Sequence, residues 1–474
     1  RQSHSGKHPE PGMDKTLSEL LVAQALEYAD ETAGGFGDQN KFPMSPQLIA
    51  LLATQARYPD EQLASFLTLT LDQMASLGLR DHIGGGFFRY TIDPAWDTPH
   101  FEKMLYDNAQ LAIIYLRAAD ILQRPQYRAV ALDTLDFVLG SMKHPQGGYV
   151  SSLSAVDDKN IEGGYYLWQN EQLQALLGKE ELDLVKQVWG ATGAPYLEAG
   201  PHLKYVTSLA AAAKQLQQPE SKLEQVLQRA KKKLLNARQT RVLPVDDKVL
   251  AAWNGLLLTA LSEAARLTGK AHYQQAAGEL YQVLANRFWN GKELFRFLHN
   301  NQPSGQVSLE DYAYVSQGMI AWASVSKDMA AWNLARDIAI TGLDYFHNEN
   351  GWQLSASLAI PYNARELVLA DQTMPSPSAT LLQTLNTIAT HRQETRQAEE
   401  VLRYADIDLP DEALCEQLTG TRPLVLIVDD NQAVRRYIAG IVKDDYDFLC
   451  AADGAEGLCQ IERQLPDVIL SDVM

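Results

Sequence analysis

The chain has 474 residues, of which 46% are hydrophobic and 21% charged, and its formal net charge is −18. This length allows two or more domains with large cores, and the acidic balance argues against a nucleic-acid or anionic-membrane surface and fits a protein acting on small molecules. No apolar run approaches the ~20 residues of a membrane span. The cysteines are Cys415, Cys450 and Cys459. Residues 1–414 therefore hold no disulfide or cysteine-based zinc site, and we expect a cytoplasmic protein.

We expect a flexible polar segment at 1–13, and helical periodicity dominates from there up to residue 405. It predicts helices at 16–30, 45–57, 60–77, 102–121, 126–142, 222–236, 248–267, 271–287, 310–328, 330–347, 377–391 and 393–405. Short connections alternate with long ones rich in glycine and aromatic residues, which is expected of a closed ring of hairpins with one elaborated face. Twelve helices predict six hairpins in a mainly α domain over 14–405, with an insertion of short helices at about 159–221.

The segment HIGGGFFRYTIDPAWDTPHFEKMLYDNAQL, residues 82–111, carries the densest set of chemical groups in the chain. Its glycines and prolines exclude a helix over 82–100, whereas helical spacing begins at Glu102. A loop rich in polar and aromatic side chains that leads into a firm helix is a typical place for a functional site.

From Thr421 onward the pattern is that of an α/β fold. Residues 406–421 indicate a linker, and PLVLIVDD at 423–430 is an apolar, β-branched run typical of a buried parallel strand. A helix, a strand, a helix and a strand are expected to follow, at 431–443, 446–451, 454–464 and 467–472. This order is the beginning of a doubly wound, flavodoxin-like domain over 422–474, which would be incomplete at its last residue.

Six motifs along residues 14–400 carry a family resemblance. They are GGFGDQNKFP (34–43), the 82–111 segment, EGGYYLW (162–168), DDKVLAAWNGLLL (246–258), LEDYAY (309–314) and MPSPSATLL (374–382). They closely resemble the barrel portion of the thioredoxin-domain-containing family also described as spermatogenesis-associated or N-acylglucosamine 2-epimerase-like. The resemblance implies an (α/α)6 barrel of the six-hairpin glycosidase type, and a reaction by analogy. The chain departs from the family pattern in the loops at 152–157 and 375–378.

The tail resembles the amino-terminal half of a response-regulator receiver domain, on VLIVDDNQAVRR and PDVILSDVM. The resemblance implies that Asp429, Asp430, Asp472 and the carbonyl of Met474 bind Mg²⁺, with Asp472 as the phosphoacceptor. A histidine kinase or phosphotransfer protein would then be a partner. Because the later strands of such a domain are not expected within 422–474, we predict that this segment cannot complete a phosphorylation switch by itself.

Proton-transfer groups are the first candidates for chemistry in the barrel. His100 and Glu102 are the best acid–base candidates because an imidazole titrates near neutral pH; a loop cap and a favourable helix N-terminal charge are their structural alternatives. His82 is a candidate second base, with a loop hydrogen bond as its alternative. Asp157 and Asp311 are carboxylates of the kind that a glycosidase needs in a facing pair.

Seven further residues are candidates for substrate contact: Lys41, Arg89, Trp96, Asp107, Asn108, Trp253 and Asn254. An arginine can clamp a hydroxyl or carboxylate, but Arg89 can equally pair with Asp93 or Asp97. The tryptophans can stack on a sugar ring or pack in the core. A buried hydrogen-bond network is an equal alternative for Asp107 and Asn108.

These features predict a carbohydrate-active or carbohydrate-binding barrel with a small-molecule sugar as its ligand. The leading hypothesis is a 2-epimerase or aldose–ketose isomerase in which His100 or His82 moves a proton beside an open-chain carbonyl, with no cofactor in the barrel. Two alternatives remain open. One is a glycoside hydrolase with paired carboxylates, and the other is a non-catalytic sensor or scaffold in phosphorelay signalling.

Overall fold

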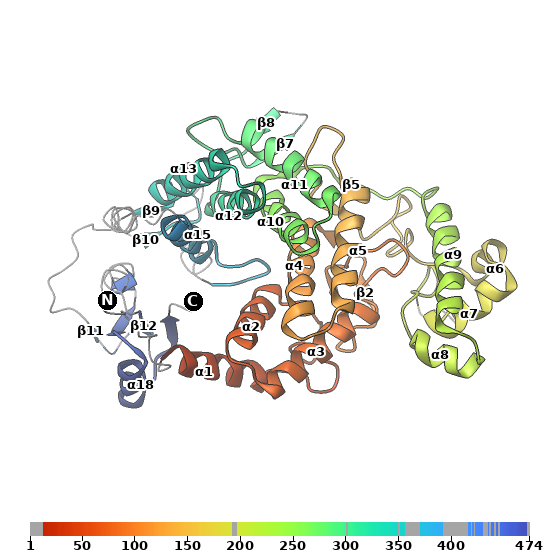
Figure 1. Cartoon of the computed structure of the whole chain (residues 1–474), viewed down its shortest axis with the longest axis horizontal. Coiled ribbons are helices and arrows are strands. Elements are labelled where there is room, and N and C mark those ends of the chain that lie inside the picture. Colours follow the sequence, from red (N-terminus) through yellow and green to blue (C-terminus); the bar gives the residue numbers. More distant parts are fainter. Residues whose placement is uncertain are drawn as a thin grey trace, which may run out of the picture.

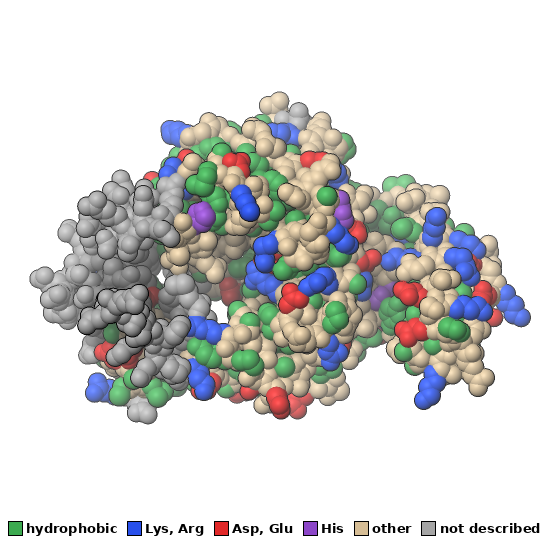
Figure 2. Space-filling view, viewed as in Figure 1, with side chains coloured by type: hydrophobic (Ala, Val, Ile, Leu, Met, Phe, Trp, Pro, Cys, Tyr) green, Lys and Arg blue, Asp and Glu red, His purple; other side chains and the backbone are tan. Residues whose placement is uncertain are grey.

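The computed structural model describes residues 13–191, 197–299, 302–348, 351–355 and 370–391, and residues 416–471 with gaps at 419, 421, 430–434, 436–437, 440–441 and 444–445. Over these ranges the chain forms a ring of helices, a helical lobe on the outside of the ring, and a small sheet built from the tail (Figure 1). Acidic and basic side chains are interspersed over the visible face of the ring and lobe (Figure 2).

The ring has an inner and an outer layer of helices. The inner helices are α2 (Ser45–Arg57), α4 (Leu105–Ile121), α10 (Ala251–Thr268), α12 (Leu309–Ser326) and α15 (Pro377–His391), and each packs against the next. The outer helices α3 (Glu61–Ser76), α5 (Gln126–Ser141), α11 (Ala271–Val283) and α13 (Met329–Phe346) pack on the inner helices that precede or follow them in sequence. A further helix, α1 (Met13–Glu27), contacts α2 and α3, and a π-helical turn, η1 (Leu284–Phe288), follows α11.

The predicted helical ring is thus confirmed over the described residues, with helix bounds within a few residues of the expected ones, and the helix expected at 393–405 lies outside the described residues. Burial explains the two layers. Side chains are buried around most of α4, α10 and α12, which lie between neighbours on several sides, whereas the outer helices keep an exposed face. Local signals fix the ends: the Asp60 carboxylate accepts a hydrogen bond from the backbone of Leu63 at 2.7 Å and caps α3.

The two ends of the ring differ in their connections. Turns of a few residues follow the inner helices α2, α4, α10 and α12, whereas long loops precede the inner helices. The described parts of these loops contain ten short strands: β1 (Tyr90–Thr91), β2 (Pro99–His100), β3 (Lys103–Met104), β4 (Ser152–Leu153), β5 (Val245–Asp246), β6 (Val249–Leu250), β7 (Phe297–His299), β8 (Gln302–Ser304), β9 (His347–Asn348) and β10 (Gly351–Trp352). They pair antiparallel as β1–β2, β3–β4–β5, β6–β7–β8 and β9–β10. The loop-rich end is the face that the alternating loop lengths predict.

A glycine turn occurs twice on this face with the same hydrogen bonds. Asp30 pairs with Gly35, and Asp81 with Gly86, through backbone bonds of 2.9 and 3.0 Å. Gly86 has a φ of +74°, and a Cβ there would lie 2.3 Å from the Phe137 ring. Only glycine meets both demands. The triplet at 84–86 is therefore a tight turn.

The lobe is a separate bundle of α6 (Asn170–Leu176), α7 (Lys179–Trp189), α8 (Leu209–Leu216) and α9 (Glu220–Arg238) with its own apolar core. The pattern assigned the helix at 222–236 to the ring, but α9 packs on α6, α7 and α8. That assignment was wrong because amphipathic spacing identifies a helix and not the core that its apolar side chains, such as Leu223, Val226 and Leu234, enter. The inserted unit therefore extends past the expected limit at 221.

The tail forms a four-stranded sheet in the order β11–β13–β12–β14. The strands β12 (Leu424–Val428), β13 (Asp447–Ala451) and β14 (Val468–Ser471) are parallel, and β11 (Glu416–Gln417) runs antiparallel to β13. The helix α18 (Gly454–Arg463) packs against α1 of the ring (Figure 1). The three expected strands and the second helix are confirmed, while most of the helix expected at 431–443 lies outside the described residues.

Within the described residues, no helix combines the length and the apolar character needed to cross a lipid bilayer.

Candidate functional site

The loop-rich face places His100 between two carboxylates. His100 ends β2, opposite Tyr90 of β1. Its Nδ1 lies 3.2 Å from a carboxylate oxygen of Glu162, and its Nε2 lies 3.7 Å from Oε2 of Glu102. The side chain is 30% exposed. An imidazole that reaches solvent and contacts an acid at each nitrogen is suited to accepting and returning protons.

Arg89 completes this charged cluster. Its guanidinium donates to Oε2 of Glu102 at 3.0 Å, and its backbone NH donates to the Glu102 carbonyl at 2.9 Å. The expected partners Asp93 and Asp97 were wrong: Asp93 accepts backbone bonds within its own turn, and Asp97 pairs with Lys204 of the lobe. The hairpin of β1 and β2 brings Arg89 opposite Glu102, and this pairing cannot be read from the distance between them in the sequence.

The cluster favours the protonated imidazole. Contact with Glu102 raises the pKa of His100, burial opposes this, and the charge of Glu162 adds to it. The same contact with His100 lowers the pKa of the Glu102 carboxyl against the opposing effect of burial. Glu102 is therefore ionised at neutral pH, and His100 holds its proton to a higher pH than a free imidazole.

Aromatic stacking orients the imidazole. The ring of Tyr90 stacks on His100 with centroids 5.1 Å apart, and the ring of Phe42 stacks on Tyr90 with centroids 4.6 Å apart. Phe42 is 37% exposed. These aromatic contacts limit the rotation of the imidazole between its two carboxylates.

The first turn of α4 adds a buried carboxyl next to the cluster. Asp107 is 5% exposed, and its Oδ2 has no hydrogen-bond partner among the described residues. Burial raises the pKa of this carboxyl well above its usual value; the charge of Arg89 opposes the rise and that of Glu102 increases it. Burial therefore favours the neutral, protonated form of the Asp107 carboxyl. Beside it, Tyr106 packs edge-on against Trp253 of α10, with centroids 4.8 Å apart.

Lys41 and Trp96 are buried supports of the first glycine turn rather than available ligands for a substrate. The Lys41 ammonium donates to Asp30 at 2.7 Å and to the Gly34 carbonyl at 2.5 Å. The fully buried Trp96 indole donates to the Ala33 carbonyl at 2.9 Å. Their prediction as substrate contacts is corrected on this ground, because their polar groups already bind the chain itself.

Asn108 and Asn254 occupy equivalent places on α4 and α10. Each side-chain oxygen accepts a backbone NH, from Phe87 at 2.7 Å and Tyr149 at 2.9 Å, and each amide nitrogen donates back to the carbonyl of the same residue. Each amide nitrogen also donates to the carbonyl four residues before it. The asparagines hold the long loops on the inner helices, so the structure assigns them to loop anchoring and not to substrate binding.

His82 is a packing residue. Its Nε2 lies 3.1 Å from the Leu77 carbonyl, and its ring meets Tyr205 of the lobe edge-on. Burial, together with the charge of Arg80, lowers the pKa of His82 to about 3. A buried imidazole so hard to protonate is a poor base, which corrects the hypothesis of a second catalytic histidine.

Asp157 and Asp311 organise the backbone. Asp157 accepts bonds from Lys159 and Ile161 in its own turn, each at 2.9 Å. At the start of α12, the Asp311 carboxylate accepts a hydrogen bond from the backbone NH of Ser308 at 2.8 Å. Burial raises the pKa of Asp311 to about 7. Neither carboxylate joins the His100 cluster through a described contact, which leaves Glu102 and Glu162 as the acids nearest to it.

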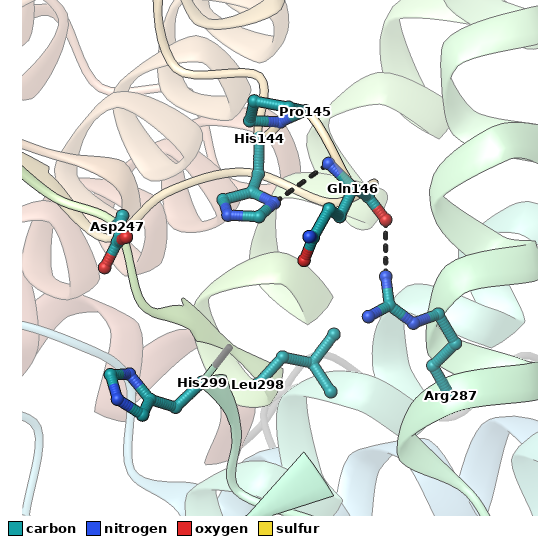
Figure 3. Close-up of a pocket in the computed structure, with 7 residues that line it drawn as sticks. All are labelled: His144, Pro145, Gln146, Asp247, Arg287, Leu298 and His299. Carbon is teal, nitrogen blue, oxygen red and sulfur yellow. Dashed lines mark hydrogen bonds between the residues drawn. The ribbon is translucent and has the colours of Figure 1, made fainter. Parts of the chain in front are cut away.

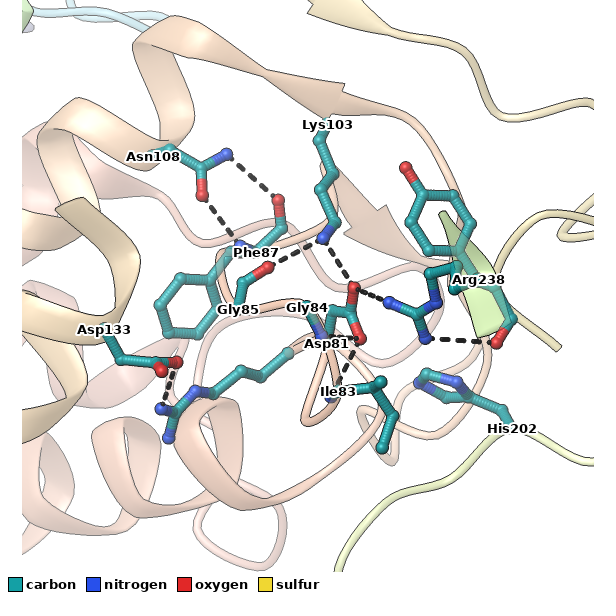
Figure 4. A network of polar contacts seen from close by, with 12 residues as sticks. Asp81, Ile83, Gly84, Gly85, Phe87, Lys103, Asn108, Asp133, His202 and Arg238 are labelled. Atoms are coloured by element: carbon teal, nitrogen blue, oxygen red, sulfur yellow. Dashed lines mark hydrogen bonds and ion pairs between the residues drawn. The ribbon is translucent and has the colours of Figure 1, made fainter. Parts of the chain in front are cut away.

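A buried ion network lies beneath the glycine triplet (Figure 4). One oxygen of Asp81 accepts Lys103 at 2.8 Å and Arg238 at 2.7 Å, while the other accepts the backbone of Ile83 and Gly84, both at 3.0 Å. Lys103 follows the motif loop and Arg238 ends α9, so the network joins the lobe to the ring under the site. No sequence signal identified it, because its members lie up to 157 positions apart.

A surface pocket of about 190 Å³ lies elsewhere on the loop-rich face (Figure 3). It is lined by His144, Pro145, Gln146, Asp247, Arg287, Leu298 and His299. Its lining shares no residue with the His100 cluster. Across the described ranges, no three His, Cys, Asp or Glu side chains are arranged to hold a metal ion.

In the tail, the structure describes one of the four residues expected around Mg²⁺. Asp429 follows β12, the central strand, and is 7% exposed. Asp430, Asp472 and Met474 lie outside the described residues. The metal site and the phosphoacceptor therefore stay predictions.

Comparisons with known proteins bear on the ring. No family model matches the sequence. The chain is 30% identical over 366 residues to human spermatogenesis-associated protein 20, a match that covers 68% of this chain and 46% of that protein. It is 27% identical over 396 residues to an uncharacterized protein of Caenorhabditis elegans, covering 75% and 54%. The chain spans about half the length of the curated relatives it matches.

Solved structures identify the fold. A cellobiose 2-epimerase from Bacillus thermoamylovorans superposes with a TM-score of 0.50 at 9% identity, covering 84% of this chain and 88% of that one. A D-mannose isomerase superposes with a TM-score of 0.51 at 10% identity, covering 83% and 86%. At such low identity the likeness is one of fold, and the fold is the (α/α)6 six-hairpin barrel that the sequence motifs imply.

Proposed function

We propose that the ring is a carbohydrate-active barrel of the sugar 2-epimerase or aldose–ketose isomerase type, and that it shares the family of spermatogenesis-associated protein 20. The observation that carries this proposal is the part-exposed His100 between Glu102 and Glu162, at the loop-rich face of the ring. The sequence similarity to that relative supports the family. The likeness in fold to a cellobiose 2-epimerase and a D-mannose isomerase agrees with the reaction type.

In the proposed reaction, His100 removes the proton from the carbon beside an open-chain carbonyl. The electron pair of that C–H bond forms the C=C bond of an enediol, and the carbonyl oxygen takes a proton. Return of the proton from the imidazolium to C1, with loss of the proton on O2, gives the ketose. The epimer forms when the enediol turns its other face to the same imidazolium before the proton returns to C2 and the proton on O1 is lost. Arg89, whose side chain is 38% exposed, is placed to stabilise negative charge that develops on the oxygen.

The substitution His100→Ala tests this proposal, with mono- and disaccharide aldoses as substrates. Loss of a general base typically lowers turnover about 10²- to 10⁴-fold. Incubation in D₂O adds a second measurement, because proton transfer through the imidazole exchanges the C2 hydrogen with solvent. His272→Ala, at a surface histidine that is 53% exposed on α11, is the matched control and should retain turnover. Full turnover and C2 exchange in the His100→Ala protein would remove His100 from the mechanism.

Glycoside hydrolysis is the rival reaction. Glu102 and Glu162 contact opposite nitrogens of His100, so the acid pair that a glycosidase needs exists near the site. The products separate the two reactions. A hydrolase releases a second sugar from a disaccharide, whereas an epimerase or isomerase leaves the substrate mass unchanged.

We further propose that the tail is a receiver-like segment, and with it a sensor or scaffold role is the second candidate function. The parallel order β13–β12–β14 supports this, with Asp429 after the central strand. The acidic Asp429 carboxylate fits a Mg²⁺ ligand, which would offset charge on an incoming phosphoryl group. Incubation with acetyl phosphate and Mg²⁺ tests it. Labelling that Asp472→Asn abolishes favours signalling, and no labelling favours an inert segment.

A further inference from the structure

Two buried side-chain oxygens on α4 have no donor among the described residues. They are Oδ2 of Asp107, whose residue is 5% exposed, and Oε1 of Gln110, whose residue is 1% exposed. The two residues are three positions apart, so they share a face of the helix about one turn from each other. Buried polar atoms without partners are uncommon in native proteins, and a pair of them on one face requires an explanation.

The orientation of the Gln110 amide is fixed by its other atom. Its nitrogen donates to the Tyr106 carbonyl at 3.2 Å and to the Thr373 carbonyl at 2.9 Å. Reversing the amide would set its oxygen against both carbonyls and break both bonds. The unpartnered atom is therefore the acceptor, and it awaits a donor such as a hydroxyl group.

The surroundings of Asp107 tie the same face to the charged cluster. Arg89 and Glu102, which contact His100 or one another, also act electrostatically on the Asp107 carboxyl. Tyr106, the residue before Asp107 on α4, packs edge-on against the ring of Trp253 on α10. The Asp107 carboxyl thus lies within electrostatic reach of the two residues, Arg89 and Glu102, that belong to the His100 cluster.

We propose that Asp107 and Gln110 form the floor of the sugar site, where the Asp107 carboxyl donates to the carbonyl oxygen of a polyhydroxy aldehyde or ketone and the Gln110 oxygen accepts the neighbouring hydroxyl. This inference rests on the proposed function and names the group that supplies the proton taken by the carbonyl oxygen. As His100 takes the C2 proton, the carbonyl oxygen takes the Asp107 proton, which leaves a neutral enediol, an imidazolium and a carboxylate. Return of the two protons restores both residues, so no co-reactant is needed.

Two substitutions in the full chain test the floor. Asp107→Asn keeps the shape and the ability to donate a hydrogen bond but has no proton to transfer. Gln110→Leu removes the acceptor. Mannitol is the binding probe because it carries hydroxyls and no carbonyl, and binding is measured by calorimetry. Gln383→Leu, at an exposed glutamine of α15, is the control.

We expect Asp107→Asn to lower turnover of aldoses at least 100-fold while the mannitol Kd stays within threefold. Gln110→Leu should weaken mannitol binding at least tenfold, and Gln383→Leu should change neither. Asp107→Asn should leave the ligand-free melting temperature nearly unchanged, because it replaces one buried polar group by another of the same shape, whereas Gln110→Leu should lower it, because the Tyr106 and Thr373 carbonyls lose their donor. A fall in the melting temperature of both variants with mannitol binding unchanged in both would assign them a structural role and overturn the inference. If the wild-type protein binds mannitol but turns over no sugar, the proposed reaction is wrong and the inferred sugar site stands. If the wild-type protein does not bind mannitol, the inferred sugar site is wrong.

Discussion

Loss of the Asp81 charge should destabilise the ring and the lobe together. Burial alone raises the pKa of Asp81, but the charges of Arg238 and Lys103 hold the pKa of this carboxyl well below its usual value. All three side chains are at most 3% exposed. In Asp81→Asn the two cations keep their burial and lose their counter-charge. Removal of one partner from a buried ion group costs about 3–5 kcal/mol of unfolding free energy.

This cost converts into a melting shift of measurable size. Unfolding entropy is about 2.1 cal/mol/K per residue, so about 380 residues of ring and lobe give about 0.8 kcal/mol/K, and the loss predicts a fall of about 4–6 °C. Differential scanning calorimetry measures it. The fall should be larger at pH 6 than at pH 9, because burial already lowers the pKa of Lys103 to about 8 and an unpaired Lys103 releases its proton at high pH.

The matched control is an exposed ion pair. Lys143 and Glu279 lie 2.9 Å apart with side chains 52% and 48% exposed, so Glu279→Gln should cost below about 1 kcal/mol. Equal melting shifts for Asp81→Asn and Glu279→Gln, or a shift for Asp81→Asn that ignores pH, would refute the reasoning that burial makes this network costly to break.

Three further predictions follow from the loop-rich face. The logarithm of kcat/KM should rise with unit slope as the pH passes a pKa above 6.5, because the base form of His100 appears only above its raised pKa. Glu102→Gln should move that rise to lower pH. A value of kcat/KM that falls over the same pH range would instead make His100 the acid. Asn254→Ala should cost about 1–3 kcal/mol in urea unfolding, because it leaves the Tyr149 backbone unpaired in a buried loop, and an unchanged midpoint would contradict the anchoring role. Gly86→Ala should lower the melting temperature and expose Phe137, with a wild-type fluorescence and melting curve as the contrary result.

The helical ring was predictable because its information is local. Apolar spacing and capping residues such as Asp60 act within one or two turns, and each expected helix of the described ring was found within a few residues. The position of α9 was not predictable in the same way. Its apolar side chains recur at the same helical spacing as those of a ring helix, and only the tertiary contacts of Leu223 and Leu234 assign it to the lobe.

The site was predictable in part, for a related reason. His100 and Glu102 are two positions apart in a motif, so sequence alone brings them together. Glu162 lies 62 positions beyond His100, and Tyr90 reaches it only through the hairpin. Gln110 was missed although helical spacing places it on the face of Asp107, and that spacing was the available signal.

The polar residues of the loop-rich face fall into two groups, and the difference separates structural from chemical roles. Lys41 with Asp30 and Lys103 with Asp81 repeat one arrangement, in which an ammonium binds a turn aspartate and a glycine carbonyl. These two ammonium groups donate their hydrogen bonds to the chain itself and so hold the loops in place. Asp107 is buried beside them without a partner for Oδ2 among the described residues. Oδ2 of Asp107 differs from other buried unpaired atoms near the site, such as Nε of Arg89 and Nε of Arg238, because other nitrogens of those two guanidiniums do have partners. This difference favours a ligand as the partner of the Asp107 carboxyl.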